Sequence, residues 1–286
     1  MIYKLVHKTL GVKQNSLFSE FKLDYEIKDI CFVPSIGFFF TANQCLGKVG
    51  LLGEIVFPFA GKVDVSIIEN GYLQRSTFKD PSGICYSKLL ESIMVSECGG
   101  KRIRKLKIKD GYYTNSHFAN RFDNTIDNLF QNKYDGGKTF ISEYDRCVVW
   151  GNCLANYVFS VWDLDYLSIY GNGKSGFTYS NIKEKNKLTN PSGACYMKNI
   201  LYISDKNNNC IRFFGDDGYG VIGKPLNKDI YPEKIVCIKD RLYFMDRNTL
   251  RYVVPSKEEF PIIEENASIV SICNGDKDQL AILIGE

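Results

Sequence analysis

The run of this chain most similar to a catalytic motif is Gly171-Asn172-Gly173-Lys174-Ser175. Its Gly-Lys-Ser ending occurs in phosphate-binding loops, where backbone amides and a lysine hold the phosphates of a nucleotide. Such a loop also needs a glycine where Ser168 stands and a helix directly after its last residue. The following Gly176-Phe177-Thr178-Tyr179 favours a loop or a strand. We therefore predict a glycine turn that connects strands, and no nucleotide site.

Histidine is too scarce for most catalytic or metal sites. His7 and His117 are the only histidines, and they lie in unrelated segments. A triad or a zinc site with several histidines would have to use both of them. Carboxylates and asparagines are plentiful, but their positions do not assign them to one site. We predict no catalytic residue, no metal site and no cofactor, and we favour a non-enzymatic role.

The cysteines follow a pattern that is typical of buried thiols. Ten are present, and three occupy one repeated position, in Ile30-Cys31-Phe32, Ile84-Cys85-Tyr86 and Ala194-Cys195-Tyr196. Strand-forming neighbours and recurrence at equivalent sites indicate small core residues. No Cys-x-x-Cys pair indicates zinc, and disulfide-rich secreted scaffolds are much shorter. We predict free thiols in a reducing compartment, and therefore an intracellular, cytoplasmic protein.

The densest charge run extends from Lys101 to Lys109 and is followed by several aromatic residues. Basic side chains bind nucleic-acid phosphates, and aromatic rings stack on unpaired bases. The candidate binding residues are Lys101, Arg102, Arg104, Lys105, Lys107, Tyr112, Tyr113, His117 and Phe118. The formal net charge of the whole chain is only +3, which gives RNA binding little driving force. Lysines on an outer strand would also discourage edge-to-edge association, without any ligand.

The elements that must position these residues form a repeat. Pro81-Ser82-Gly83-Ile84-Cys85-Tyr86 is followed much later by Pro191-Ser192-Gly193-Ala194-Cys195-Tyr196. Each copy continues with a tight polar turn, a second apolar strand, a polar loop and a third strand. The same template fits six times, with starts near Lys28, Pro81, Lys138, Pro191, Pro232 and Ser268. The ends of the second strands in the first five units, at Ala42, Glu97, Gly151, Asp205 and Asp246, are 55, 54, 54 and 41 residues apart, which suits four-stranded propeller blades.

The last unit ends after two strands, and the N-terminal Ile2–Val6 and Ser16–Phe18 can supply the outer two. Such closure removes the free edges of an open array. We predict an all-β protein, a six-bladed β-propeller closed by strands from both termini, as a single domain over residues 1–286. We also predict an inserted loop or short helix at about 107–137, because apolar residues there have helical spacing.

Between Pro191 and Arg212 the chain resembles the NHL-repeat family, whose units pair a Pro-Ser-Gly-Ile/Val opening with a downstream Asp-x-x-Asn-x-Arg-Ile run. Asp205, Asn208, Ile211 and Arg212 match that run, and Cys210 stands where the family usually has arginine. In the earlier copy Glu97 and Gly100 replace the acid and the amide, while Arg102-Ile103 is kept. The resemblance implies a β-propeller. We predict that the Asp205 and Asn208 side chains bond the backbone of the polar turn, and this structural role explains both residues without a metal or catalytic function.

We predict a non-catalytic propeller that serves as a protein-interaction scaffold or as a structural part of a larger assembly, with contacts in the region 101–130. The resemblance leaves two alternatives, a single-stranded RNA-binding propeller of the NHL type and a metal-dependent lactonase or hydrolase. Frequent Lys, Asn, Ile, Tyr and Phe are typical of AT-rich genomes, including many bacteriophages, so a virion component is one version of the scaffold. No apolar run approaches 18 residues, which predicts no membrane association.

Overall fold

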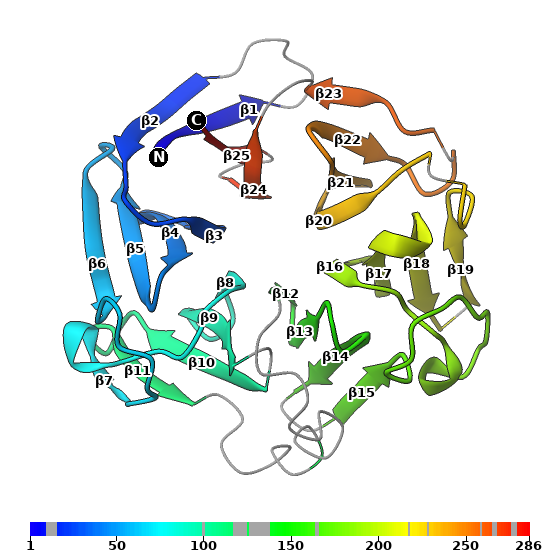
Figure 1. Ribbon diagram of the computed structural model, residues 1–286, viewed down its shortest axis with the longest axis horizontal. Helices are drawn as coiled ribbons and strands as arrows, with labels where there is room; N and C mark the ends of the chain where they lie inside the picture. The colour runs from blue at the N-terminus through cyan, green and yellow to red at the C-terminus, as the bar shows by residue number, and fades with distance from the viewer. Residues whose placement is uncertain are drawn as a thin grey trace.

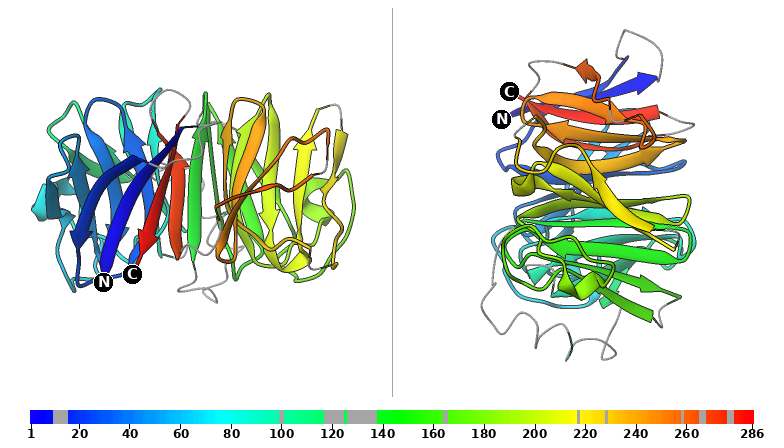
Figure 2. Two further views of the ribbon diagram at one scale, coloured as in Figure 1. Left: turned by 90° about the horizontal axis from the view of Figure 1, so that it is seen from above. Right: turned by 90° about the vertical axis from the view of Figure 1, so that its right-hand side faces the viewer.

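The computed structural model describes residues 1–9, 16–98, 101–116, 125, 138–163, 166–216, 218–227, 229–257, 259–264, 268–275 and 279–286. Their strands form six antiparallel sheets around one central axis (Figure 1). Figure 2 shows that the strands run along the short axis of a disc. Short 3-10 helices occur at η1 (Leu73–Arg75), η3 (Lys183–Lys185) and η4 (Lys206–Asn208). The predicted all-β, six-bladed propeller is confirmed.

Each sheet is one blade whose innermost strand is followed in the chain by the next strand outward, and blade 2 has an additional outer strand that precedes its innermost strand. Blade 1 contains β3 (Ile27–Val33), β4 (Gly37–Ala42), β5 (Cys45–Gly50) and β6 (Ile55–Gly61). Blade 2 contains β8 (Ile84–Ser87), β9 (Ser92–Glu97), β10 (Arg102–Lys107), β11 (Tyr113–Ser116) and, at its outer edge, β7 (Gly71–Tyr72). Blade 3 contains β12 (Thr139–Tyr144), β13 (Cys147–Asn152), β14 (Tyr157–Trp162) and β15 (Tyr166–Tyr170).

The other three blades repeat this plan, and the last one joins the two ends of the chain. Blade 4 contains β16 (Pro191–Met197), β17 (Ile200–Asp205), β18 (Cys210–Gly215) and β19 (Gly218–Ile222). Blade 5 contains β20 (Pro232–Ile238), β21 (Arg241–Asp246), β22 (Thr249–Val253) and β23 (Ile262–Glu264). Blade 6 contains β24 (Ile269–Asn274), β25 (Gln279–Gly285), β1 (Ile2–Thr9) and β2 (Ser16–Lys22).

Blade 6 closes the ring as the sequence predicts. Strand β1 lies between β25 and β2, and Tyr3 pairs with Gly285 on one side and with Phe21 on the other. Both predicted N-terminal strands are longer than expected. Because β1 is paired along both edges, the junction of the two chain ends leaves no open strand inside the sheet.

Blade 2 differs from the prediction in the place of its basic strand. β10 is paired with β9 on one side and with β11 on the other, so the basic run does not form an outer edge. Residues 113–116 of the predicted insertion form β11. Residues 117–137, apart from Thr125, lie outside the described residues, and so does the helix predicted there.

Apolar side chains fill the spaces between neighbouring blades. Between blades 4 and 5, Tyr202 and Ile211 pack into one cluster with Leu242 and Phe244. Trp150 of blade 3 is fully buried and stacks on Phe159 at 5.4 Å between ring centroids. Each blade thus buries both faces against its neighbours, which explains why the strand sequences are apolar with little alternation.

A carboxylate–arginine pair fastens the interior of blade 4. Asp205 ends β17, and its Oδ1 accepts a hydrogen bond from the backbone N–H of Thr189 at 2.7 Å. Its Oδ2 accepts a bond from Asn208 Nδ2 at 2.8 Å and lies 3.6 Å from Arg212 of β18. Asp205 therefore joins the incoming loop to the second and third strands, which confirms its predicted role in building turns and extends it.

Two other blades repeat this pair at equivalent positions. In each, the carboxylate ends the second strand and accepts the backbone N–H of a residue just before the first strand. The partners are Glu97 with Arg104 at 3.0 Å and Lys79 N–H at 3.1 Å, and Asp246 with Arg251 at 2.6 Å and Tyr231 N–H at 2.9 Å. In all three blades a carboxylate thus joins the incoming loop to the end of the second strand, although the residue types differ.

We expect Arg212→Ala to lower the free energy of unfolding by about 3–5 kcal/mol, because it leaves the buried Asp205 carboxylate without its counter-charge. Arg146→Ala is the matched control, since the Arg146–Asp163 pair is exposed (61% and 38% of the two side chains) and should cost less than about 1 kcal/mol. Urea unfolding followed by tryptophan fluorescence measures both. Equal losses for the two variants would contradict the role given to Arg212.

Candidate functional site

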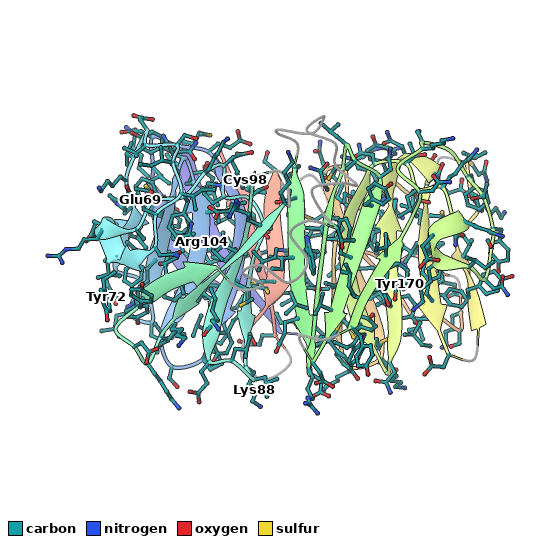
Figure 3. All side chains as sticks on the ribbon, turned by 90° about the horizontal axis from the view of Figure 1, so that it is seen from below. Glu69, Tyr72, Lys88, Cys98, Arg104 and Tyr170 are labelled. Atoms are coloured by element: carbon teal, nitrogen blue, oxygen red, sulfur yellow. The ribbon has the colours of Figure 1, made fainter. Side chains whose placement is uncertain are left out.

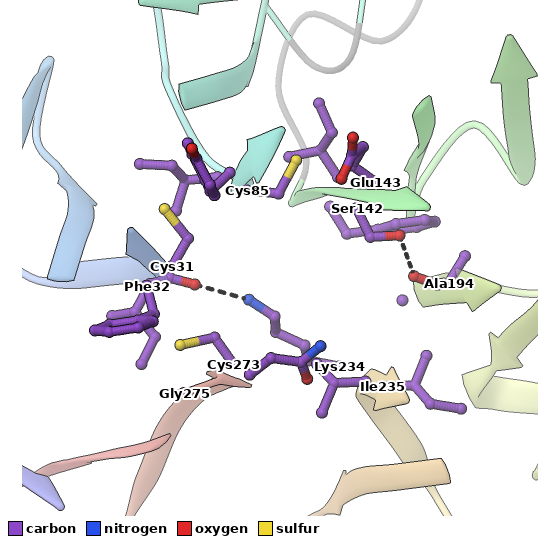
Figure 4. A pocket seen from close by; sticks show the side chains of 18 of the residues that line it. Cys31, Phe32, Cys85, Ser142, Glu143, Ala194, Lys234, Ile235, Cys273 and Gly275 are labelled. Carbon is purple, nitrogen blue, oxygen red and sulfur yellow. Dashed lines mark hydrogen bonds between the residues drawn. The ribbon is translucent and has the colours of Figure 1, made fainter. Parts of the chain in front are cut away.

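The innermost strands of all six blades surround an axial channel, and two of the cavities along it are described below. The first has a volume of about 280 Å³ and is lined in part by Cys31, Cys85 and Cys273; we call it the thiol cavity (Figure 4). The second has a volume of about 270 Å³ and is lined in part by Lys28, Lys138, Lys206 and Lys234; we call it the lysine cavity. It lies at the end of the channel where the innermost strands begin.

One level of the channel lies between the two cavities, and we call it the neck. Each blade contributes one residue near the start of its innermost strand: Asp29, Gly83, Phe140, Gly193, Lys234 and Ser271. Phe140 and Lys234 line both cavities. The sequence already aligns Gly83, Gly193 and Lys234, which follow Pro-Ser, Pro-Ser and Pro-Glu.

Asp29 is the hydrogen-bonding centre of the neck. Its Oδ1 accepts bonds from the N–H of Ile30 at 2.8 Å, from Ser271 Oγ at 2.7 Å and from Lys234 Nζ. Its Oδ2 accepts the N–H of Ile84 at 3.0 Å. Donors from blades 1, 2, 5 and 6 thus converge on one buried carboxylate, as burial of a charge requires.

Lys234 reaches across the channel toward β3 (Figure 4). Besides Asp29, its ammonium group donates to the carbonyl oxygen of Ile30 and to Ser271 Oγ, each at 3.3 Å. Three acceptors use all three protons of the ammonium group. The most central charged groups of the channel are therefore fully bonded to each other and are not available as a free acid or base.

The thiols of the thiol cavity are held in their neutral form. Burial raises the pKa of Cys31 and of Cys85 well above the ordinary value, and raises that of Cys273 to about 12. The nearby Cys273 and Cys85 thiols raise the pKa of Cys31 further. A neutral thiol is a poor nucleophile and a poor metal ligand. All ten cysteines are free, as predicted.

Glu143 is the acidic residue at the mouth of the thiol cavity. Burial raises its pKa, while a hydrogen bond from Ser87 and backbone bonds from Lys88 and Leu89 lower it. Ser87 Oγ donates to Glu143 Oε1 at 3.0 Å. These bonds hold the first turn of blade 2 against blade 3, which is a structural use of the carboxylate.

The predicted basic site is only partly at the surface. Arg104 is fully buried, and its guanidinium binds Glu97 at 3.0 Å and the carbonyl oxygens of Glu69 at 2.8 Å and Thr77 at 3.3 Å. Arg104 and Glu69 are labelled in Figure 3. The prediction that Arg104 binds a surface ligand is corrected, because these contacts use its guanidinium inside blade 2.

The remaining members of that predicted site lie apart or are engaged by neighbours. Lys101 is half-buried and Arg102 is exposed. Lys105 is half-buried, and burial and then Lys107 lower its pKa. The other described members make these contacts: Lys107 with Asp110 at 3.1 Å, Tyr112 with Phe59 at 4.9 Å, and Tyr113 with Tyr72 at 4.8 Å between ring centroids. His117 and Phe118 lie outside the described residues.

The other motif candidates have structural places. Strand β15 ends at Tyr170, and the described residues after Ser175 begin no helix there. Asn172 Oδ1 instead accepts the N–H of Lys174 at 3.0 Å within the loop. This confirms that the Gly-Lys-Ser run is not a phosphate-binding loop. His7 stacks on Phe18 in blade 6, with 5.0 Å between ring centroids.

Sequence reasoning missed the neck. Its signal was the replacement of the repeat glycine by a charged residue, at Asp29 in the first unit and at Lys234 in the fifth. The two residues are 205 positions apart, so no local pattern connects them. Once the blades are placed around one axis, the opposite charges become neighbours.

We expect Asp29→Ala to lower the free energy of unfolding by about 3–5 kcal/mol, because Lys234 then stays buried without a counter-charge. The double variant Asp29→Ala/Lys234→Met should recover at least half of that loss, since it leaves no unpaired charge. Urea denaturation of both single variants and the double variant measures the coupling. Additive losses would show that the two side chains do not act as a pair.

The thiols give a prediction about pH. The unfolded chain ionises its thiols near pH 9, whereas the folded protein keeps Cys31, Cys85 and Cys273 protonated to higher pH. Their contribution to stability is therefore complete below pH 9 and is lost as the pH rises through the folded pKa. Each thiol should lower the free energy of unfolding by roughly 1 kcal/mol for each pH unit above pH 9.

Unfolding free energies at pH 8, 9, 10 and 11 should therefore fall less steeply in the triple variant Cys31→Ala/Cys85→Ala/Cys273→Ala than in the natural sequence. The quantity to compare is the slope of the unfolding free energy between pH 9 and 11, because the cavities left by the substitutions lower that free energy equally at every pH. Identical slopes would contradict the protonated state of these thiols.

The comparisons with known proteins identify the fold. No family model and no curated protein matches the chain. A chain in a crystal structure of the nidogen/laminin complex is similar with a TM-score of 0.58 and 14% identity, over 90% of this chain and 91% of that chain. A streptogramin B lyase structure is similar with a TM-score of 0.54 and 13% identity, over 99% and 98%.

A catalytically inactive virginiamycin B lyase from Staphylococcus aureus, solved with quinupristin, is similar with a TM-score of 0.56 and 13% identity, over 99% of this chain and 100% of that chain. At such identities the likeness concerns the fold alone, and that fold is shared by at least one enzyme. No helix among the described residues is long and apolar enough to cross a membrane. The chain is thus a six-bladed β-propeller with solved structural neighbours of diverse kinds.

Proposed function

We propose that this protein is a non-catalytic scaffold, alone or as a structural part of a larger assembly, that binds another protein at the rim of blades 1 and 6. The observation that carries the proposal is a group of exposed apolar side chains there, which we call the apolar rim: Leu17, Leu51, Leu52, Ile55 and Val56. Leu52 is 97% exposed. Single exposed leucines are common, but a group of this kind is typical of an interaction site.

The turn that presents Leu51 and Leu52 has a fixed conformation. Gly50 N–H donates to the carbonyl oxygen of Glu54 at 2.8 Å, and Gly53 N–H donates to that of Gly50 at 2.9 Å. Ser19 Oγ of β2 donates to the carbonyl oxygen of Gly53 at 3.2 Å. The turn between β5 and β6 is thereby held against blade 6. A preformed turn loses little conformational entropy when a partner binds.

The outer edge of β6 favours side-chain contact over strand addition. Pro58 lies within β6 and has no N–H to donate. Gln74 Nε2 already bonds the carbonyl oxygens of Pro58 and Phe59, at 3.3 and 3.4 Å. We therefore expect a partner with a complementary apolar surface that packs on Leu51 to Val56, rather than a strand that extends the sheet.

The alternatives receive less support. For an NHL-type RNA-binding propeller, two of the proposed binding residues are already engaged: Arg104 is fully buried and Lys107 is paired with Asp110. For a metal-dependent hydrolase, the part of the chain that the structure describes brings together no three His, Cys, Asp or Glu side chains that could hold a metal. The charged centre of the channel, Asp29 with Lys234, is bonded within itself.

The test compares partner recovery by the natural protein with recovery by Leu51→Asp/Leu52→Asp. We expect the double variant to lose at least about tenfold in affinity, because two charges in an apolar interface must be desolvated without a partner. Leu226→Asp is the matched control, at a leucine that is 64% exposed and lies in a loop of blade 4. Binding is measured by quantitative co-purification from the source cells and then by titration with the isolated partner.

Light scattering of the purified protein shows whether the partner is a second copy of the chain. Both variants should keep the melting temperature of the natural protein, since each replaced side chain is exposed. Recovery of the same proteins in equal amounts by all three forms, together with unchanged self-association, would overturn the proposal.

A further inference from the structure

The lysine cavity is a second concave site, separate from the apolar rim. Its walls come from blades 1, 3, 4, 5 and 6, and the neck residues Asp29, Lys234 and Ser271 form its floor. Its volume of about 270 Å³ suits a molecule smaller than a typical drug-sized ligand. Because the groups of the floor are bonded to one another, a ligand would meet the side chains of the walls.

The charges of these walls do not cancel. Three of the four lysines have an acidic partner: Lys28 with Asp80 at 2.5 Å, Lys206 with Glu233 at 3.0 Å, and Lys234 with Asp29. Lys138 is exposed at the mouth, and within the described residues its ammonium group has no ion pair or hydrogen bond. One positive charge is therefore left over in a concave site, where the field of that charge is focused.

Lys138 and Lys206 line the cavity from blades 3 and 4. Cys153 lines the same cavity, and burial raises the pKa of its thiol to about 11, while the charges of both lysines lower it. Lys206 is held in place over the ring of Tyr231, 4.9 Å from the centroid. It uses one proton on Glu233, which leaves two for a ligand.

Neutral donors complete the wall. Asn190 lines the cavity, and its side-chain amide has no hydrogen-bond partner within the described part of the chain. Glu233 offers a second carboxylate oxygen to a ligand hydroxyl. Two ammonium groups, an amide and one carboxylate around a small space match an anion that carries hydroxyl groups, because lysines bind carboxylates and phosphates as point charges.

We infer that the lysine cavity binds a small hydroxylated organic dianion, a phosphate monoester or a dicarboxylate, with its anionic groups on Lys138 and Lys206. The ligand would sit at the mouth of the channel, above the Asp29–Lys234 pair. The thiol cavity lies beyond that pair, on the other side of the neck. The site makes no use of the apolar rim, so it can be tested independently of the scaffold proposal.

Isothermal titration calorimetry at 20 mM salt tests the site with four probes: glycerol 3-phosphate, malate, inorganic phosphate and neutral glycerol. We expect saturable binding of glycerol 3-phosphate or malate, weaker binding of inorganic phosphate and none of glycerol. The preferred probe identifies the anionic group. Affinity should fall severalfold at 200 mM salt, because the charges at the mouth are screened.

Lys138→Ala should weaken binding of the preferred probe at least about tenfold, while Lys88→Ala, at the mouth of the thiol cavity, should leave it unchanged. Lys138 is exposed, so its replacement should not affect folding, and the melting temperature checks this. The inference is overturned if no organic anion binds saturably below 10 mM, or if Lys138→Ala binds as tightly as the natural protein. It is overturned equally if Lys88→Ala causes the same loss.

Discussion

The close approach of six innermost strands around one axis determines what this propeller can do. At the neck, a methyl group added to Gly83 or to Gly193 would lie 2.8 Å from the backbone nitrogen of Ile141 or of Ile235. Glycine is thus required there so that neighbouring blades can touch. On the other side of the ring, Asp29, Lys234 and Ser271 replace glycine and fill the space. The thiol cavity and the lysine cavity lie on opposite sides of these residues.

The same neck also fixes how the blades are arranged. A buried ion pair gives little net stability, because desolvation offsets most of the attraction between the charges. The pair acts by destabilising other arrangements of the blades, in which its charges would be buried apart. Asp29 is satisfied only when donors from four blades converge on it. A displacement of blade 5 leaves a charge buried and unpaired, and a displacement of blade 6 removes the hydrogen bond from Ser271. A propeller constrained in this way is a rigid platform, and a rigid platform is what a scaffold needs.

Local patterns predicted the blades because each strand, turn and glycine is determined by nearby residues. Even the closure by N-terminal strands, predicted at Ile2–Val6 and Ser16–Phe18, followed from counting strands. The charge run of blade 2 was misread because charge alone does not say which way a side chain points. The signal was present: Glu97 and Arg104 are seven residues apart, as are Asp205 and Arg212. By contrast, the neck depends on Asp29 meeting Lys234 after the ring has closed, which no local pattern contains.

The distribution of charge separates the parts of the molecule that serve the fold from those available for binding. Arg104, Arg212 and Lys234 are buried or nearly so, and each is bonded to a carboxylate, because an unpaired charge in the interior would destabilise the blades. Lys138 lies at a cavity mouth, where water solvates it, and no described residue forms an ion pair with it. An exposed charge of that kind costs no stability, yet the low-dielectric walls around it strengthen its attraction for an anion. The residues that hold the propeller together and those that are free to bind can thus be told apart by whether their charges are already paired.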